Sequence, residues 1–324
     1  MKKIISLLSV VLAAFSAYAQ DAQSAAAAAA DAIVNAPAEK VEAPKPNYWK
    51  TSVQFDLGLN QTGLFNWAAG GYNTMSLAAG IDAKADYAKD CAAWNNRLQL
   101  NYGFLWSADK KNLLQKSTDR IYLESKYAYK TAADSKWNYT ASLDFRSQFT
   151  NSYDDYKQDP ATEEWSGTLK SGFFAPAYTN LALGMEWKPT DWFNVNFAPL
   201  TGGLVAVSNP ILRETYGMPK DGDAYKNVLF QFGAQVKANV KAVVNDVFTY
   251  ETQVVFFTDY LNKPFNWNRV NWDNKISWQL SKLFKIGLDT WMIYDPLVAI
   301  NGTVSKVQFK EFISVNFTYK ISGK

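Results

Sequence analysis

The chain has 324 residues, a formal net charge of +3, 48% hydrophobic and 15% aromatic residues, one cysteine (Cys91) and no histidine. Without histidine, Ser-His-Asp and Cys-His catalysis, histidine metal sites and imidazole proton relays are excluded. A single cysteine forms neither an intramolecular disulfide nor a thiolate zinc site, and the near-balance of charge gives no support for nucleic-acid binding.

The first 19 residues have the three parts of a secretory signal peptide. Lys2 and Lys3 form a positive n-region, residues 4–15 are apolar, and Ala17-Tyr18-Ala19 fits the small-x-small cleavage rule. An uncleaved membrane anchor is the alternative, but it requires an apolar run of about 20 residues. We therefore predict a signal peptide over 1–19, cut after Ala19.

Residues 20–47 are rich in alanine, proline and charge, and no aromatic residue occurs among them. Such a segment buries too little apolar surface to offset the entropy of ordering it. We predict a disordered periplasmic tail over 20–47. The composition changes abruptly at Tyr48, so we expect one folded domain over 48–324.

From Trp49 onward, apolar and polar side chains alternate with a period of two, which is typical of a strand with unlike faces. No run of about 18 apolar residues follows, which argues against transmembrane helices. Twelve such segments are predicted as strands, at 49–60, 73–87, 92–106, 117–130, 137–150, 173–187, 191–206, 226–241, 246–260, 268–280, 284–295 and 306–321.

The connections between these segments alternate between short and long. Most of the segments are also longer than the about 9–11 residues with which a tilted strand crosses a bilayer. An even strand number, short turns at one end and long loops at the other are typical of outer-membrane barrels. The sequence therefore predicts an all-β fold, a transmembrane antiparallel up-and-down barrel of about 12 strands, with both termini periplasmic.

Aromatic residues gather on the apolar phase, close to the short turns. Amphipathic rings prefer the boundary between lipid headgroups and hydrocarbon, so we predict a girdle there. The expected partners of the barrel exterior are outer-membrane lipid and lipopolysaccharide. A soluble β-sandwich or lipocalin-like shell shows the same alternation but gives no reason for rings at one level. The predicted girdle comprises Trp49, Tyr87, Trp94, Trp137, Trp187, Trp278 and Tyr319.

Several short motifs resemble a Bacteroidota barrel family known only as a domain of unknown function. The resemblance runs from about Trp49 to Tyr319, and it implies an outer-membrane barrel without implying any activity. Such barrels often end on an aromatic residue, whereas this chain ends in Ile321-Ser322-Gly323-Lys324. The motifs are Asn66-Trp67-Ala68-Ala69-Gly70-Gly71, Lys116-Ser117-Thr118-Asp119, Phe174-Ala175-Pro176-Ala177-Tyr178, Tyr216-Gly217 and Tyr294-Asp295.

The polar phase of the strands carries acids and bases in nearly equal numbers, and we predict that it lines the lumen. Two interpretations are open: an ion-pair network that fills the barrel, or a narrow hydrated path for a small polar solute. Twelve strands lie between the filled barrels of about eight and the open channels of about 16–18. The predicted lumen residues are Asp82, Lys84, Arg97, Glu124, Lys126, Asp144, Arg146, Glu186, Lys237, Glu251, Asp273, Lys275 and Asp289.

Three long connections contain further candidates. The first contains Asn66, Trp67, Gly70 and Gly71, which either fold back as a plug or form a surface turn. Acidic residues crowd 154–164 and either bind a divalent cation or form a solvated hairpin tip, although their spacing does not match a calcium loop. Asp221-Gly222-Asp223 predicts a turn.

We expect a non-enzymatic barrel without a cofactor or a metal site. Paired carboxylates at Asp144 and Glu186 are a remaining enzymatic alternative, as in glycoside hydrolysis. The leading hypothesis is a narrow channel for small polar solutes. The second is a structural or accessory subunit with a filled, salt-bridged lumen that docks other envelope proteins.

Overall fold

A computed structural model describes residues 47–62, 73–245, 247–261, 268–298 and 306–323. Contacts divide the chain into Met1–Asn47 and Tyr48–Lys324, and the second unit is the one discussed below. The predicted signal peptide, the predicted tail and the Asn66–Gly71 segment lie outside the described residues, so those expectations remain predictions.

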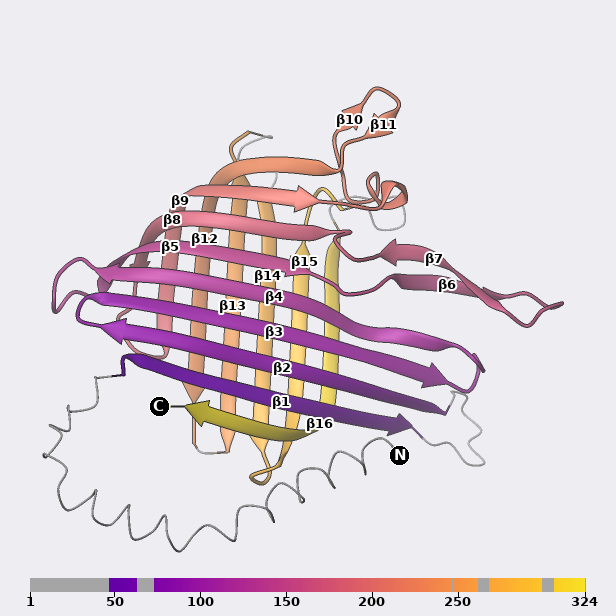
Figure 1. Cartoon of the computed structure of the whole chain (residues 1–324), viewed down its shortest axis with the longest axis horizontal. Coiled ribbons are helices and arrows are strands. Elements are labelled where there is room, and N and C mark those ends of the chain that lie inside the picture. Colours follow the sequence, from indigo (N-terminus) through magenta and orange to yellow (C-terminus); the bar gives the residue numbers. More distant parts are fainter. Residues whose placement is uncertain (1–46, 63–72, 246, 262–267, 299–305, 324) are drawn as a thin grey trace, which may run out of the picture. The chain divides into compact units, whose positions relative to one another are not determined.

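Twelve strands form a closed antiparallel barrel in which the first strand pairs with both the second and the last (Figure 1). Each barrel strand otherwise pairs with the barrel strands before and after it along the chain, so the predicted twelve-stranded up-and-down barrel is confirmed. The barrel strands are β1 (Trp49–Thr62), β2 (Thr74–Lys89), β3 (Ala92–Ser107), β4 (Leu114–Lys130), β5 (Trp137–Ser147), β8 (Ala177–Trp187), β9 (Phe193–Ala206), β12 (Val228–Val243), β13 (Phe248–Asp259), β14 (Asn268–Gln279), β15 (Phe284–Tyr294) and β16 (Val307–Gly323).

Two small hairpins interrupt this order, and both occur in long connections at the same end of the barrel (Figure 1). The hairpin β6 (Ser152–Gln158) and β7 (Trp165–Ser171) follows β5. The hairpin β10 (Lys220–Asp221) and β11 (Ala224–Tyr225) follows β9, and Gly222 occupies its turn with a φ of 64°. A positive φ suits glycine, so the predicted turn at 221–223 is confirmed.

Strand β8 begins four residues later than the alternation predicts. Phe174 has a φ of 52°, and Pro176 has no N–H to donate to a ladder. The backbone therefore turns through 172–175, where Gly172 and Ala175 exchange backbone hydrogen bonds. Alternation alone does not detect such a turn, because Phe173 and Ala175 keep the apolar phase.

A β-bulge in the middle of β9 surrounds Pro199. Along β9 the pairing moves three residues, from Phe197 to Leu200, while β8 moves two, from Met185 to Leu183. The same offset occurs against β12. Proline lacks a ladder donor and is tolerated within a sheet at bulges, so the local sequence explains the irregularity.

The barrel is apolar outside and polar inside, the reverse of a soluble protein. On β1, Phe55, Leu57 and Leu59 are 42%, 48% and 54% exposed. By contrast, Asp144 and Glu186 are 4% and 2% exposed. Alternation in a closed barrel sends every second side chain inward, so the buried charges occupy the interior.

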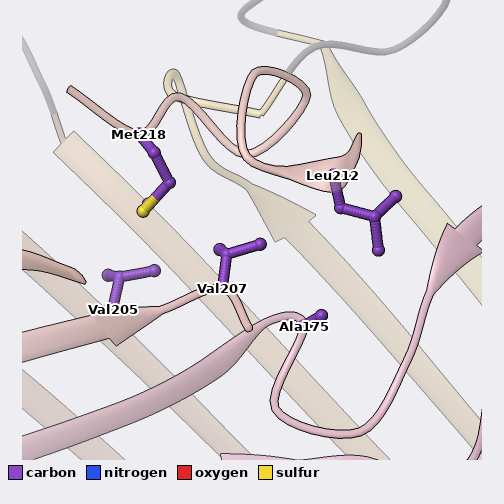
Figure 2. Close-up of a cluster of buried hydrophobic side chains, with 5 residues drawn as sticks. All are labelled: Ala175, Val205, Val207, Leu212 and Met218. Carbon is purple, nitrogen blue, oxygen red and sulfur yellow. The ribbon is translucent and has the colours of Figure 1, made fainter. Parts of the chain in front are cut away.

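A small hydrophobic cluster lies at the long-connection end, where the segment 207–227 packs on β9 (Figure 2). Leu212 comes from the 3-10 helix Pro210–Leu212, whose N-cap Asn209 accepts a hydrogen bond from the Ile211 backbone N–H. We call this cluster the cap: Ala175, Val205, Val207, Leu212 and Met218. None of the helical structure in the described residues is long and apolar enough to cross a membrane.

The cap is held by polar contacts as well as apolar ones. The Arg213 guanidinium donates to the backbone carbonyl oxygens of Val207, Ser208 and Tyr225, at 3.1–3.2 Å. The Tyr216 hydroxyl donates to the Lys170 carbonyl oxygen at 3.0 Å, which joins the cap to β7. Burial raises the pKa of Tyr216 to about 12, because the phenolate form is poorly solvated there.

Candidate functional site

Two ion pairs join strands on opposite sides of the barrel. Arg97 on β3 lies 3.7 Å from Glu251 on β13, and Arg120 on β4 lies 3.1 Å from Asp273 on β14. In the ring of twelve strands, each pair of strands is six places apart. A contact between opposite walls has to cross the interior, so these side chains span the lumen.

Shorter bridges link strands that are two to four places apart in the ring. Lys285 on β15 lies 2.7 Å from Asp56 on β1, and Lys237 on β12 lies 2.8 Å from Glu124 on β4. Lys126 on β4 pairs with Glu186 on β8. Buried charges of this kind are costly unless they are paired, and each of these has its counter-ion.

One side of the lumen, formed by β5, β8 and β9, is tightly packed with polar side chains. Asn180 donates to the Asp144 carboxylate at 3.1 Å, and Asn196 donates to the Thr140 hydroxyl at 2.6 Å. Thr201 is fully buried and donates to the Ala198 carbonyl oxygen. We call this region the packed side.

Tyr122 on β4 contacts one acidic and two cationic side chains inside the barrel. Its hydroxyl donates to Glu124 at 2.6 Å, and the guanidinium carbons of Arg120 and Arg146 lie 5.0 and 5.1 Å from its ring centroid. Arginine stacked on an aromatic ring gains a cation–π attraction. The tyrosine therefore helps to hold two arginines inside the barrel.

The remainder of the lumen contains a cavity of about 280 Å³. Its wall comes from β1–β4 and β12–β16, and β5, β8 and β9 contribute nothing to it. We call this region the cavity side. Along β15 the cavity wall extends from Lys285, the second residue of the strand, to Trp291, so it follows much of the height of the barrel.

The structure separates the predicted lumen residues into two groups. Seven of them line the cavity, namely Asp82, Lys84, Arg97, Glu251, Asp273, Lys275 and Asp289. Six are not part of its wall, namely Glu124, Lys126, Asp144, Arg146, Glu186 and Lys237. Sequence reasoning did not select every residue that lines the cavity. Arg120 and Tyr122 on β4 and Lys285 and Trp291 on β15 line it and share the phase of the selected charges on their strands.

The charged groups of the cavity differ in how well they are paired. Arg97 and Asp82 form a bidentate pair, with nitrogen–oxygen distances of 3.0 and 2.5 Å. Lys84 and Lys275, by contrast, form no ion pair with a described residue, because no described carboxylate oxygen lies within 4.0 Å of either ammonium nitrogen. The cavity therefore contains charge that its own wall leaves incompletely neutralised.

The carboxylates considered for glycoside hydrolysis are far apart. In the β5–β8 register, Asp144 faces Asn180 whereas Glu186 faces Asn138, so six residues separate the two positions. At about 3.3 Å per residue this is roughly 20 Å, and paired glycosidase carboxylates lie about 5–9.5 Å apart. That enzymatic alternative is wrong.

The acidic segment 154–164 pairs with a cation of the protein itself. Asp154 and Asp155 lie 3.2 and 3.6 Å from the Lys170 ammonium nitrogen on β7, and hydrogen bonding to Asp154 raises the pKa of Lys170. Within the described part of the chain, no group of three or more histidine, cysteine, aspartate or glutamate side chains is arranged to hold a metal ion.

Several of the aromatic residues near the short turns contact one another on the outside. The ring of Trp49 lies 5.2 Å from that of Tyr87 and 5.8 Å from that of Trp94, and Trp137 lies 6.4 Å from Trp187. Trp278 and Tyr319 are more than half exposed. These rings occur on four hairpin ends and on the first and last strands, so they are spread around the barrel.

A family described as "Protein of unknown function (DUF3078)" matches residues 59–153. The match includes the Asn66–Gly71 and Lys116–Asp119 motifs and ends before the three later motifs of the resemblance. It therefore supports a likeness to a family of unknown function over a shorter region than 49–319. None of the curated proteins matches this sequence.

Solved structures of membrane barrels give distant matches. An outer-membrane channel from Pseudomonas putida F1 is 10% identical with a TM-score of 0.37, covering 88% of this chain and all of the other. The NanC porin is also 10% identical with a TM-score of 0.37, covering 83% and 97% of the two chains. The translocator domain of the autotransporter NalP from Neisseria meningitidis is 10% identical with a TM-score of 0.32, covering 87% and 90%.

Proposed function

We propose that the chain is a non-enzymatic outer-membrane β-barrel whose lumen provides a narrow passage for small polar solutes. The membrane assignment rests on the inverted distribution of side chains, with exposed leucine and phenylalanine outside and buried acids and bases inside. Lipid is the solvent in which such an exterior is stable, and a closed barrel leaves no unpaired strand edge within it.

The orientation follows from the connections. Short turns at one end and long connections with hairpins at the other match barrels inserted from the periplasm, so we assign both termini to the periplasmic side. The aromatic rings from Trp49 to Tyr319 then form a girdle at the periplasmic interface, in contact with lipid, and lipopolysaccharide surrounds the other end. The Bacteroidota origin implied by the resemblance is part of this proposal.

The observation that supports a passage is the cavity on the cavity side, which follows β15 from Lys285 to Trp291. Its wall combines charged groups of both signs with amide side chains, including Asn101 and Gln253. Hydrated polar walls of this kind suit a small polar solute, and the bridges Arg97–Glu251 and Arg120–Asp273 make the path narrow.

Planar-bilayer recording of the purified full chain tests the passage. We expect small, reproducible single-channel steps from the unmodified protein. The variant Arg120→Ala removes a side chain that crosses the lumen, so its steps should be larger. Lys170→Ala lies on β7 outside the barrel wall and is the matched control, with steps of unchanged size. Silent membranes with both the unmodified protein and Arg120→Ala would exclude the passage.

The packed side and the bridges between opposite walls favour a second function. A lumen held shut by ion pairs suits a structural or accessory subunit whose loops dock other envelope proteins. In that case the barrel is electrically silent and co-purifies with a defined complex from membranes. Arg120→Ala would then lower the thermal stability of the barrel and leave it silent.

A further inference from the structure

The wall of the cavity carries one more basic than acidic side chain. This inference rests on the proposed passage, because it concerns what the same cavity binds. The bases are Lys84, Arg97, Arg120, Lys241, Lys275 and Lys285, and the acids are Asp56, Asp82, Glu251, Asp273 and Asp289.

Four of the five acids are engaged with specific bases of the wall. Asp56 pairs with Lys285, Asp82 with Arg97, Glu251 with Lys241 and Asp273 with Arg120, at 2.5–3.1 Å. The fifth, Asp289, faces Lys275 in the β14–β15 register. Each of the five acids is thus assigned to a different base. Among the described groups of the wall, Lys84 is the base to which no acid is assigned.

The position of Lys84 makes this imbalance worse. In the β2–β3 register, Lys84 stands directly opposite Arg97, so two cations face each other across neighbouring strands. Like charges in directly opposed positions destabilise a sheet. The Arg97 guanidinium forms ion pairs with Asp82 and Glu251. These two carboxylates are therefore already engaged by Arg97 and form no ion pair with Lys84.

An anion from outside would relieve the repulsion. A carboxylate placed against Lys84 forms charge-assisted hydrogen bonds with its ammonium group and neutralises the excess positive charge of the wall. Lys275 lines the same cavity and supplies a second ammonium group. The rings of Trp291 and Phe312 also line it and offer apolar surface to the organic part of a ligand.

We propose that the cavity is a binding site for a small organic carboxylate, with Lys84 and Lys275 as the groups that hold its negative charge. A volume of about 280 Å³ restricts the ligand to a small molecule. Within the passage, such a site favours carboxylates over neutral solutes and over cations of similar size.

Isothermal titration of the detergent-solubilised full chain with sodium succinate tests the site. We expect binding of succinate and none of succinamide, its uncharged counterpart. Lys84→Met and Lys275→Met should each weaken succinate binding about tenfold, because each loses a charge-assisted contact. Lys282→Met, in the exposed 280–283 turn, is the control and should bind succinate like the unmodified protein.

Stability without ligand gives an independent readout. Lys84→Met removes a repulsion, so the ligand-free variant should unfold at the same or a higher denaturant concentration than the unmodified protein. A marked loss of stability would show that the wall already satisfies Lys84, and it would overturn the proposal. Equal binding of succinate and succinamide, or unchanged succinate binding in both lysine variants, would overturn it too.

The same protein in planar bilayers separates this inference from the proposed passage. Succinate binding without single-channel steps would retain the site and remove the passage. Single-channel steps with no succinate binding would retain the passage and remove the site. When both are present, Lys84→Met should shift the reversal potential in a potassium succinate gradient toward cation selectivity.

Discussion

The packed side and the cavity side of the lumen use the same residue types to different effect. On the packed side, Glu186 is 2% exposed and its counter-ion Lys126 has a side chain that is 19% exposed. On the cavity side, Lys241 pairs with Glu251 at 2.8 Å, but its side chain is 52% exposed. A charge that is sealed from water depends on its partner, whereas a hydrated charge does not, so burial decides which pairs stabilise the barrel.

The largest effect is expected from removing a sealed charge. Glu186→Ala leaves Lys126 without its counter-ion inside the packed side, and loss of one partner of a buried pair costs about 3–5 kcal/mol. Denaturant unfolding in lipid vesicles measures this loss. Glu164→Ala, an exposed acid of the β6–β7 tip, is the control. Equal unfolding midpoints for the two variants would show that the packed side is hydrated.

A variant of the cap tests whether the long connection 207–227 is held by tight packing, as the packed side of the lumen is. Leu212 is fully buried, and truncating a buried leucine costs about 2–5 kcal/mol. Leu212→Ala should therefore lose hydrogen-exchange protection throughout 207–227. Its neighbour Ile211 is 77% exposed, so Ile211→Ala should change little. The account of the cap is wrong if both variants keep full protection.

The bulge in β9 predicts a contrast between two glycines. A Cβ added to Gly184 would overlap the Phe197 carbonyl oxygen, which is backbone and has no rotamer to change. A Cβ added to Gly202 meets only the Phe230 ring, at 4.0 Å. Gly184→Ala should cost about 1–3 kcal/mol, as overpacking does, and Gly202→Ala close to nothing. Equal unfolding free energies would contradict the close approach at Gly184.

Tyr216 gives the cap a defined pH dependence. Its pKa rises to about 12 in the folded state, from an ordinary value of about 10. Its contribution to the free energy of unfolding is therefore complete below about pH 10. This contribution is lost as the pH rises toward 12, because the tyrosine of the unfolded chain deprotonates in that window before that of the folded chain. Tyr216→Phe should remove this pH-dependent part of the stability. At neutral pH it should also lower the free energy of unfolding by about 1 kcal/mol, because the hydrogen bond to the Lys170 carbonyl oxygen is lost. A difference between the two proteins that stays constant from pH 9 to 12 would contradict the assignment.

The smallest effect is expected on the cavity side. Lys241→Gln breaks an ion pair in which the lysine side chain is half exposed, and pairs of that kind contribute at most about 1 kcal/mol. Denaturant unfolding should place this variant close to the unmodified protein. A loss as large as that of Glu186→Ala would remove the distinction between the two sides.

The strand phase was predictable because alternation is a local property. It assigns Arg97 and Glu251 to the polar face of their strands, and closure of twelve strands was expected from the even count and the alternating connections. Which side chains meet was not predictable, since the opposition of β3 to β13 arises from closure of the ring. The cavity residue Trp291 was not selected for a related reason: large aromatic residues were assigned to the lipid-facing phase, although Trp291 shares the inward phase of Asp289.

The connections were the least predictable part. Residues 151–172 and 207–225 were expected to be long connections, with a hairpin tip at 154–164 as one alternative, and each contains a hairpin. The cap depends on contacts between Leu212, Met218 and Val205, whose separation in sequence leaves no periodic signal. The turn at Gly222 was predictable because glycine flanked by aspartates favours one local conformation.

Flotation in a density gradient, with and without lipid vesicles, tests the central claim most directly. If lipid is the solvent of the outer face that includes Leu57 and Leu59, the folded chain floats with vesicles. In detergent-free buffer it should then fail to form a folded monomer. A folded monomer that stays at the bottom of the gradient while the vesicles float would contradict the membrane assignment and the passage that depends on it.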